Sequence, residues 1–454
     1  MLTNSMAIRL GRGGAGLALV FMLAACASYA PRPLPDRFSA PTAAGQVQVD
    51  AMRLPPWAVH VWNPADGLDS DELAMLAVAN NPQLRATRAA LGIAHAQVFA
   101  AGLLADPQIG YSEDLAMTPG TQNAWALGLG FDISDWLMRS SRKRIAQAGA
   151  NQAEQELLWQ EWQVVNAARL SYVRMRADER LLPLLQQLRD SLRRRYEASR
   201  RAGDAGNLTA DAVAADWLTW QGAQGQLDDA YRFERQDRAV MNDLTGLDAA
   251  ARVRLSGDFV APRLDVAGLV RQFDARLRER PDMAALRAGY DAQEAGYRAA
   301  VLAQFPVLGV SINRSQDNYG DNSAGPGVVL SLPVFNRNRG NIAVARASRR
   351  QLYEEYRARW LAAQSEFHVV LDILPRLEAQ VAEVRRGMPA LEAQAHMAER
   401  AEHEGNLAAP DAARMRLAWI AKRIELIHLE QSLAEQRIAL QTLLGPALPE
   451  HPIP

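Results

Sequence analysis

A long internal repeat constrains the fold of this chain more than any other feature. Matching motifs return at a constant interval of 199 residues (280 − 81 = 405 − 206 = 445 − 246). The matching pairs are Asn81-Pro82-Gln83-Leu84 with Arg280-Pro281-Asp282-Met283, Gly206-Asn207-Leu208 with Gly405-Asn406-Leu407, and Gly246 with Gly445. A period of this length is too long for a solenoid unit. The sequence therefore predicts two copies of one complex substructure.

The first 25 residues have the composition of a bacterial export signal. Two arginines precede an apolar run, residues 14–25, which is too short to cross a bilayer comfortably. The run ends in Leu23-Ala24-Ala25-Cys26, which resembles the bacterial lipobox, and Cys26 is the only cysteine. A single cysteine cannot form an internal disulfide, so we expect a covalent lipid on Cys26 rather than a buried free thiol. Ala27 stands where an inner-membrane retention signal would carry Asp, which implies export to the outer membrane.

Charge and hydropathy exclude two classes of protein. Without residues 1–25 the chain keeps 454 − 25 = 429 residues and a formal charge of −1 − 2 = −3, because the signal contains two arginines and no acids. A near-neutral chain with interspersed signs is not a nucleic-acid-binding protein. No later stretch stays apolar for about 18 residues, so we predict no transmembrane helix. A membrane crossing would have to use strands.

Each copy is predicted to contain a helix, a strand, a polar loop, a second strand, a very long helix, a glycine turn and a long return helix. The first helix spans residues 70–104, with Ser70 as its candidate cap. Strands are predicted at residues 107–115, 123–133, 306–313 and 326–335, and a polar loop at 314–325. Large apolar residues alternate with small or polar ones along the second strand, and Val328, Leu330, Leu332 and Val334 share one face of the fourth. This alternation is typical of membrane strands and equally of a half-buried soluble sheet.

The number of strands limits how they can cross a membrane. Four strands cannot close into a barrel, and an open sheet edge is not tolerated in lipid. Other copies of the chain must then complete the sheet. Two copies would supply eight strands and fill their own interior, whereas three copies would supply twelve and leave a lumen.

The predicted helices are longer than a globular domain needs. The helix over residues 141–201 would reach on the order of 90 Å, and Pro183 and Pro375 are expected to kink the two longest helices. The last helix carries two apolar stripes, which suit a helix with neighbours on both sides. A cylinder of helices and an ordinary antiparallel bundle both explain this pattern.

Strand pairs set into duplicated helical hairpins behind a lipobox resemble the outer-membrane efflux protein (TolC-like) family. The resemblance covers residues 65–446, and its most specific motifs are the two Pro-containing segments at residues 81–84 and 280–283 and Leu330-Ser331-Leu332-Pro333-Val334-Phe335. The continuation Asn336-Arg337-Asn338-Arg339-Gly340-Asn341-Ile342 is similar to the CzcC-type heavy-metal branch, as is Ile373-Leu374-Pro375.

The resemblance implies a mainly α fold with a small β part. Duplicated long helical hairpins and four membrane strands per chain would assemble as a homotrimer into an α/β barrel duct. The implied segments are a signal peptide (1–25), an extended segment after acylated Cys26 (26–65), two duct repeats (66–247 and 248–446) and a disordered tail (447–454). Such a duct is the passive exit of a tripartite pump. It stands in the outer membrane with its helices in the periplasm, and docks with a periplasmic adaptor and an inner-membrane resistance-nodulation-division transporter.

The resemblance also places the periplasmic tips around Gly206 and Gly405. Family members often close the tip with acids six and nine residues after the tip glycine. Counted from Gly405, the first position is Asp411 and the second is Arg414, so a double acidic ring is not expected and these two could pair with each other. In the first copy Asp211 follows Gly206 after five residues. Asp411 is equally explained as an acid favoured by the dipole at a helix N-terminus.

The chain carries no motif that predicts an enzyme or a cofactor site. Residues 11–16 fit a dinucleotide fingerprint but lie in the export signal with no strand before them. Zinc-protease, Walker and nucleophile-elbow motifs are absent from the sequence. His396, His403 and Glu404 near the second tip are better explained as solvated helix residues than as ligands, so no metal site is predicted.

Two questions stay open at this point. The cargo of a duct of this kind is expected to be heavy-metal cations, with drugs or other small molecules as the alternative. A structural coiled-coil envelope lipoprotein is a further alternative, although it would have no need for two strand pairs.

Overall fold

The computed structural model describes residues 29–49, 60–259 and 266–446. The chain divides into a short unit, Met1–Ala40, whose described residues form no helix or strand, and a main unit, Pro41–Pro454. The predicted signal peptide, Cys26 and the predicted tail at 447–454 lie outside the described residues. The other predicted segment boundaries, at residues 65, 247 and 446, stay predictions.

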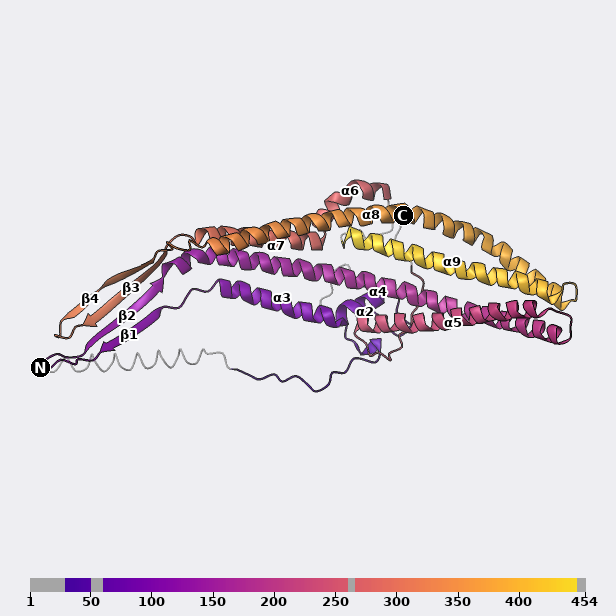
Figure 1. Ribbon diagram of the computed structural model, residues 1–454, viewed down its shortest axis with the longest axis horizontal. Helices are drawn as coiled ribbons and strands as arrows, with labels where there is room; N and C mark the ends of the chain where they lie inside the picture. The colour runs from indigo at the N-terminus through magenta and orange to yellow at the C-terminus, as the bar shows by residue number, and fades with distance from the viewer. Residues whose placement is uncertain (1–28, 50–59, 260–265, 447–454) are drawn as a thin grey trace. The chain divides into compact units, whose positions relative to one another are not determined.

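The main unit contains the predicted order of elements twice (Figure 1). After a 3-10 turn η1 (Ala44–Gln46), the first copy comprises α2 (Ser70–Asn80), α3 (Pro82–Ala101), β1 (Gln108–Asp114), β2 (Ala124–Asp132), α4 (Ile133–Asp204) and α5 (Ala210–Thr245). The second comprises α6 (Val266–Glu279), α7 (Pro281–Leu302), β3 (Val307–Gln316), β4 (Asn322–Ser331), α8 (Arg339–His403) and α9 (Ala409–Leu444). The prediction of a mainly helical fold with four strands is confirmed.

The first predicted helix is wrong in one respect, because it is two helices. The chain breaks at Asn81, whose side chain caps α3 by accepting a hydrogen bond from the Leu84 amide at 3.0 Å. Pro82 follows at the first position of α3, where its missing N–H costs nothing. Ser70 is not the cap of α2. Asp69 caps it instead, in a capping box with Glu72.

The four strands form one antiparallel sheet in the order β1-β2-β3-β4 (Figure 1). The predicted loop at residues 314–325 is too long, because β3 continues to Gln316 and β4 begins at Asn322. The residues that the two strands gain are mostly small or polar and have low strand propensity, but hydrogen bonding to the neighbouring strand overrides this local preference. β4 also ends at Ser331, before the predicted end at 335.

The long helices form two antiparallel hairpins, α4 with α5 and α8 with α9 (Figure 1). α4 has 72 residues, which corresponds to about 110 Å. It starts directly after β2 and so is longer than predicted. Pro183 lies within α4, and Pro375 and Pro389 lie within α8, without interrupting either helix. In the described part of the chain, no helix combines the length and apolarity that a bilayer crossing requires.

Equivalent contacts fasten the proline corner of each copy to the end of that copy's own return helix, α5 or α9. The Asn81 side chain donates to the Leu244 carbonyl at 2.8 Å, and Arg280, its counterpart after 199 residues, donates to the Leu443 carbonyl at 3.0 Å. The Arg280 side chain is 1% exposed and forms an ion pair with Asp282 at 2.6 Å. Its guanidinium also lies 4.9 Å from the centre of the Trp159 ring on α4. This buried arginine therefore joins the second copy to the first.

Candidate functional site

The sheet has one large apolar face. Residues paired across neighbouring strands share a face, and the register collects the large side chains on one of them: Ile109, Tyr111, Leu127, Leu129, Phe131, Val310, Ile312, Val328 and Leu330. Ile109 is 75% exposed, Ile312 65% and Val328 68%, so no described segment covers this face. A half-buried soluble sheet would hide it, and an exposed apolar surface of this kind indicates contact with another protein or with lipid.

The opposite face carries mainly small and polar residues, with Val329 as an exposed apolar exception. Asn313 pairs with Gly128 on one side and Gly325 on the other, and Ser311 pairs with Gly130 and Gly327. A Cβ atom at Gly128 would lie 2.7 Å from the Asn313 side-chain oxygen, and one at Gly327 would lie 2.5 Å from the Ser311 hydroxyl. The glycines thus make room for the polar side chains of β3 between them.

Both edges of the sheet are open within the described residues. β1 pairs with β2 alone and β4 pairs with β3 alone. Each edge strand therefore presents unpaired backbone donors and acceptors, which template pairing with another chain.

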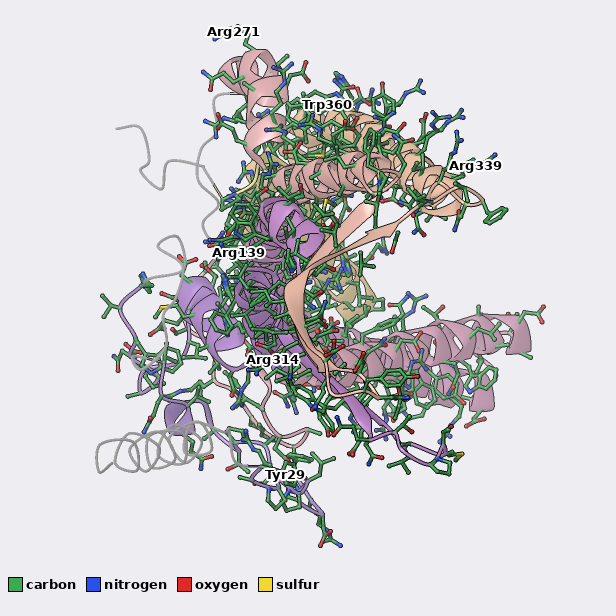
Figure 2. All side chains as sticks on the ribbon, turned by 90° about the vertical axis from the view of Figure 1, so that its left-hand side faces the viewer. Tyr29, Arg139, Arg271, Arg314, Arg339 and Trp360 are labelled. Carbon is green, nitrogen blue, oxygen red and sulfur yellow. The ribbon has the colours of Figure 1, made fainter. Side chains whose placement is uncertain are left out.

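Basic and aromatic residues gather where the strands join the helices. Trp136 is 62% exposed and Phe335 is 93% exposed. Arg139 donates to the Gly102 carbonyl at 2.6 Å, and Arg339 begins α8; both are labelled in Figure 2. Exposed aromatic rings next to arginines are typical of a membrane–water interface.

The helical tips of the two copies have the same backbone geometry. Gly206 and Gly405 have φ values of 76° and 73°, in the left-handed region that favours glycine. The amide after each glycine bonds to a carbonyl five residues back, Asn207 to Ala202 and Asn406 to Ala401, both at 2.8 Å. This is the Schellman motif, which satisfies the last carbonyls of α4 and α8.

The side chains at the tips differ between the copies. Asp211 lies in the first turn of α5, where Thr209 caps the helix, whereas Asp411 lies in the first turn of α9, which has no side-chain cap. Asp411 forms an ion pair with Arg414 on the exposed surface of α9. The two residues thus pair with each other, as the sequence allowed, and their role in closing the tip stays a prediction.

A cleft of about 850 Å³ lies between the tips of the two hairpins, lined by α4, α5, α8 and α9. Its wall includes Asp216, which sequence reasoning missed. This buried carboxylate accepts from Arg195 at 2.7 Å and from the Ser199 hydroxyl, and so fastens α5 to α4. The signal available in the sequence was an acid within an apolar stretch of α5. Arg416 and Glu399 form a second pair there, at 3.0 Å, between α9 and α8.

An acidic group lies between α4 and α5, away from the tips. The pKa of Asp178 is raised to about 7, mainly by burial and then by the negative charges of Asp237 and Glu234, while the positive charge of Arg174 lowers it. One Asp178 carboxylate oxygen is buried without a hydrogen-bond partner in the described structure. Burial also raises the pKa of Asp237.

The described residues contain no group of three His, Cys, Asp or Glu side chains arranged to hold a metal ion. His396 lies 3.6 Å from Glu399 on the same helix.

Comparison with known proteins gives one family match. Residues 274–446 match the family described as Outer membrane efflux protein. The second copy of the repeat carries the family's sequence pattern. This is a family of efflux proteins and not of enzymes, in agreement with the prediction that the chain is not an enzyme. A comparison with curated proteins finds no significant match.

Solved structures of membrane channels share this fold over nearly the whole chain. CusC, from a study of transmembrane channel formation, is 16% identical with a TM-score of 0.66, over 92% of this chain and 100% of that one. The CmeC outer membrane channel of Campylobacter jejuni is 15% identical with a TM-score of 0.68, over 93% and 95%. The MtrE outer membrane channel of Neisseria gonorrhoeae is 15% identical with a TM-score of 0.63, over 91% and 98%. At these identities the likeness establishes the fold.

Proposed function

We propose that this protein is the outer-membrane exit duct of a tripartite efflux pump and conducts its substrate passively from the periplasm to the outside. The observation that carries the proposal is the exposed apolar face on a sheet with two open edges. Open edges are not tolerated in lipid, so the strands must be completed by further copies. Three copies supply twelve strands and leave a lumen lined by the small, polar face.

The rest of the assembly follows from this arrangement. The helical hairpins would extend into the periplasm, and their glycine tips would dock with a periplasmic adaptor and an inner-membrane transporter of the resistance-nodulation-division type. A lipid on Cys26 would add an anchor in the outer membrane. Mass spectrometry of the mature N-terminus tests the lipid, and an unmodified Cys26 would refute it.

We further propose heavy-metal cations as the cargo. The support is the segment Asn336-Arg337-Asn338-Arg339-Gly340-Asn341-Ile342 after β4, which is similar to the heavy-metal branch. A strain that lacks the chain should become sensitive to metal salts and regain resistance on complementation. Sensitivity to drugs with unchanged metal tolerance would instead assign the chain to small-molecule efflux.

The duct itself is tested independently of its cargo. Purified full-length protein should run as a trimer by native mass spectrometry and give stepwise conductance in planar bilayers. A monomer without conductance would favour a structural envelope lipoprotein and refute the duct.

A further inference from the structure

A cleft rich in arginine lies between the two copies of the repeat, and neither the fold nor the proposed duct accounts for it. It has a volume of about 430 Å³ and lies among α4, α8, α9 and the segment that follows α5. Five arginines line it: Arg176, Arg180, Arg385, Arg423 and Arg437. The acids in the lining are Asp258 and Glu430. The lining therefore carries a formal charge of +3 (5 − 2).

The nearby acids accept hydrogen bonds from only some of the guanidinium N–H donors of these arginines. Glu430 is shared, because Arg180 and Arg385 both reach it at 2.7 Å. Arg176 pairs with Glu179 at 2.5 Å and lies 3.8 Å from Asp258. Arg437 pairs with Glu378 at 2.7 Å. Counting these two outer acids as well still leaves a positive balance, 5 − 4 = +1.

Two of the arginines have donors without acceptors. Arg423, which is half-buried, forms no hydrogen bond or ion pair with any described residue. The Nε atom of Arg176 is buried and has no acceptor in the described structure. A buried donor without a partner costs free energy, and an anion in the cleft would remove that cost. A guanidinium offers five N–H donors in a planar fork that matches carboxylate and phosphate groups.

The acid that organises the cleft stays ionised. Burial raises the pKa of Glu430, but the hydrogen bonds and the positive charges of Arg385 and Arg180 together outweigh burial, and the net pKa is lowered. Glu430 therefore holds Arg180 and Arg385 on one side of the cleft. The guanidinium of Arg423 and the Nε–H of Arg176 remain available to a ligand.

We propose that this cleft binds a small soluble anion that carries two or more negative charges on carboxylate or phosphate groups. Its size exceeds that of one water or one chloride, and apolar side chains such as Val173 and Ile427 form the rest of its wall. A lipid headgroup of the outer membrane is excluded by position. Arg176 lies 43 residues into α4 (176 − 133), about 65 Å along the helix from the end of β2.

Binding there would join the copies of the repeat, because α4 belongs to the first and α8 and α9 to the second. An anion held by Arg176 and Arg423 at once would bridge them. Occupancy should therefore raise the melting temperature of the full chain.

The test is a titration of the purified full-length protein in neutral detergent at low ionic strength. The probes are citrate and inorganic phosphate, with acetate as the monovalent comparison, and the readouts are isothermal calorimetry and the melting temperature. We expect saturable binding of citrate or phosphate and little binding of acetate. Arg423→Gln should weaken binding by about tenfold or more, since it removes a charged hydrogen-bond donor.

Arg386→Gln is the matched control, because Arg386 is exposed on α8 next to Arg385 and lies outside the cleft. It should bind as the wild type does. Arg423→Lys keeps the charge but loses the planar fork, so it should give an intermediate affinity. Wild-type protein that binds neither citrate nor phosphate, or equal losses in the two Gln variants, would overturn the proposal. Neither result depends on conductance, so failure here is distinguishable from failure of the duct.

Discussion

The exposed apolar face of the sheet makes the sharpest prediction, at Ile312 in the middle of β3. Ile312 pairs with Leu129 on β2 and Pro326 on β4, and its side chain is 65% exposed. If this face meets lipid, Ile312→Arg places a guanidinium near the bilayer midplane. Each such arginine costs about 2–4 kcal/mol in a membrane strand. A trimer carries three copies, so the cost is about 6–12 kcal/mol per trimer.

The adjacent residue provides a control at the same depth. Ser311 points to the small, polar face, and its neighbours across the sheet are Gly130 and Gly327. Because glycine has no side chain, Ser311→Arg meets no large group on either adjacent strand. We expect it to insert normally and to lower cation conductance, since it adds a ring of positive charge to the lumen.

The assay is folding of the purified chain into lipid vesicles, followed by the urea midpoint and by the yield of trimer. Ile312→Arg should lower both strongly, and Ser311→Arg should leave both close to the wild-type values. Equal loss in the two variants would show that the faces of the sheet are not distinguished by lipid. Normal insertion of Ile312→Arg would refute the membrane reading of this face.

Three further substitutions test the packing of the helical part. Asp282→Asn removes the acid that neutralises the buried Arg280 and should lower the unfolding free energy by about 3–5 kcal/mol. The control Asp372→Asn lies in a pair whose side chains are 69–75% exposed and should cost less than about 0.5 kcal/mol. Equal melting temperatures for the two variants would contradict this. Asp178, with its pKa raised to about 7, binds more protons folded than unfolded, so its contribution to stability is lost as pH rises from about 4 to 7. Asp178→Asn should stabilise the chain at pH 8 by about 1–2 kcal/mol, a value reduced for solvent screening of this half-buried carboxylate. At pH 4.5 the gain should be much smaller. A difference in melting temperature that does not change with pH would refute the raised pKa of Asp178. Gly246→Ala places a Cβ 2.5 Å from the Asn80 carbonyl oxygen and should lower the unfolding free energy by about 2–4 kcal/mol. The control Gly206→Ala, whose Cβ would meet nothing within 4 Å, should lower it by about 1 kcal/mol. Similar urea midpoints for the two variants would disprove the clash.

The order of the elements was predictable because the chain states it twice. A strand predicted in one copy from two-residue alternation is supported when a similar strand is predicted at the equivalent place in the other copy. The glycine tips and the long helices were found in this way, whereas the break at Asn81-Pro82 was missed because one helix was predicted over residues 70–104. The ends of the elements were harder to predict. Residues 314–316 and 322–325 are mostly small or polar, and only their pairing across the sheet shows them to be strand.

The candidate sites were predictable only where a motif marks the backbone. Gly206 and Gly405 stand out because a left-handed turn favours glycine. The pairing of Asp216 with Arg195 and the cleft around Arg423 depend on which helices meet, and the spacing of residues within one helix does not reveal this. The orientation of the two sheet faces could be predicted only in part. Alternation shows that two faces exist, but only the structure shows that the apolar one is uncovered.

Differences between the two copies show that either a neutral amide or a charged guanidinium can make the same hydrogen bond to a backbone carbonyl. Asn81 and Arg280 both donate to a carbonyl 163 residues later, and a neutral amide needs no counter-charge. Position 83 is accordingly Gln, whereas its counterpart is Asp282, which neutralises Arg280.

The two residues of each corner should therefore be exchangeable as a pair. The double substitution Arg280→Asn with Asp282→Gln copies the first corner into the second. It should destabilise the chain less than Asp282→Asn alone, which leaves a buried charge without its main partner. Arg359, which also contacts Asp282 but is partly exposed, can turn to solvent. A double variant that unfolds more readily in urea than the single one would mean that the ion pair, and not the shared carbonyl contact, holds the corner together.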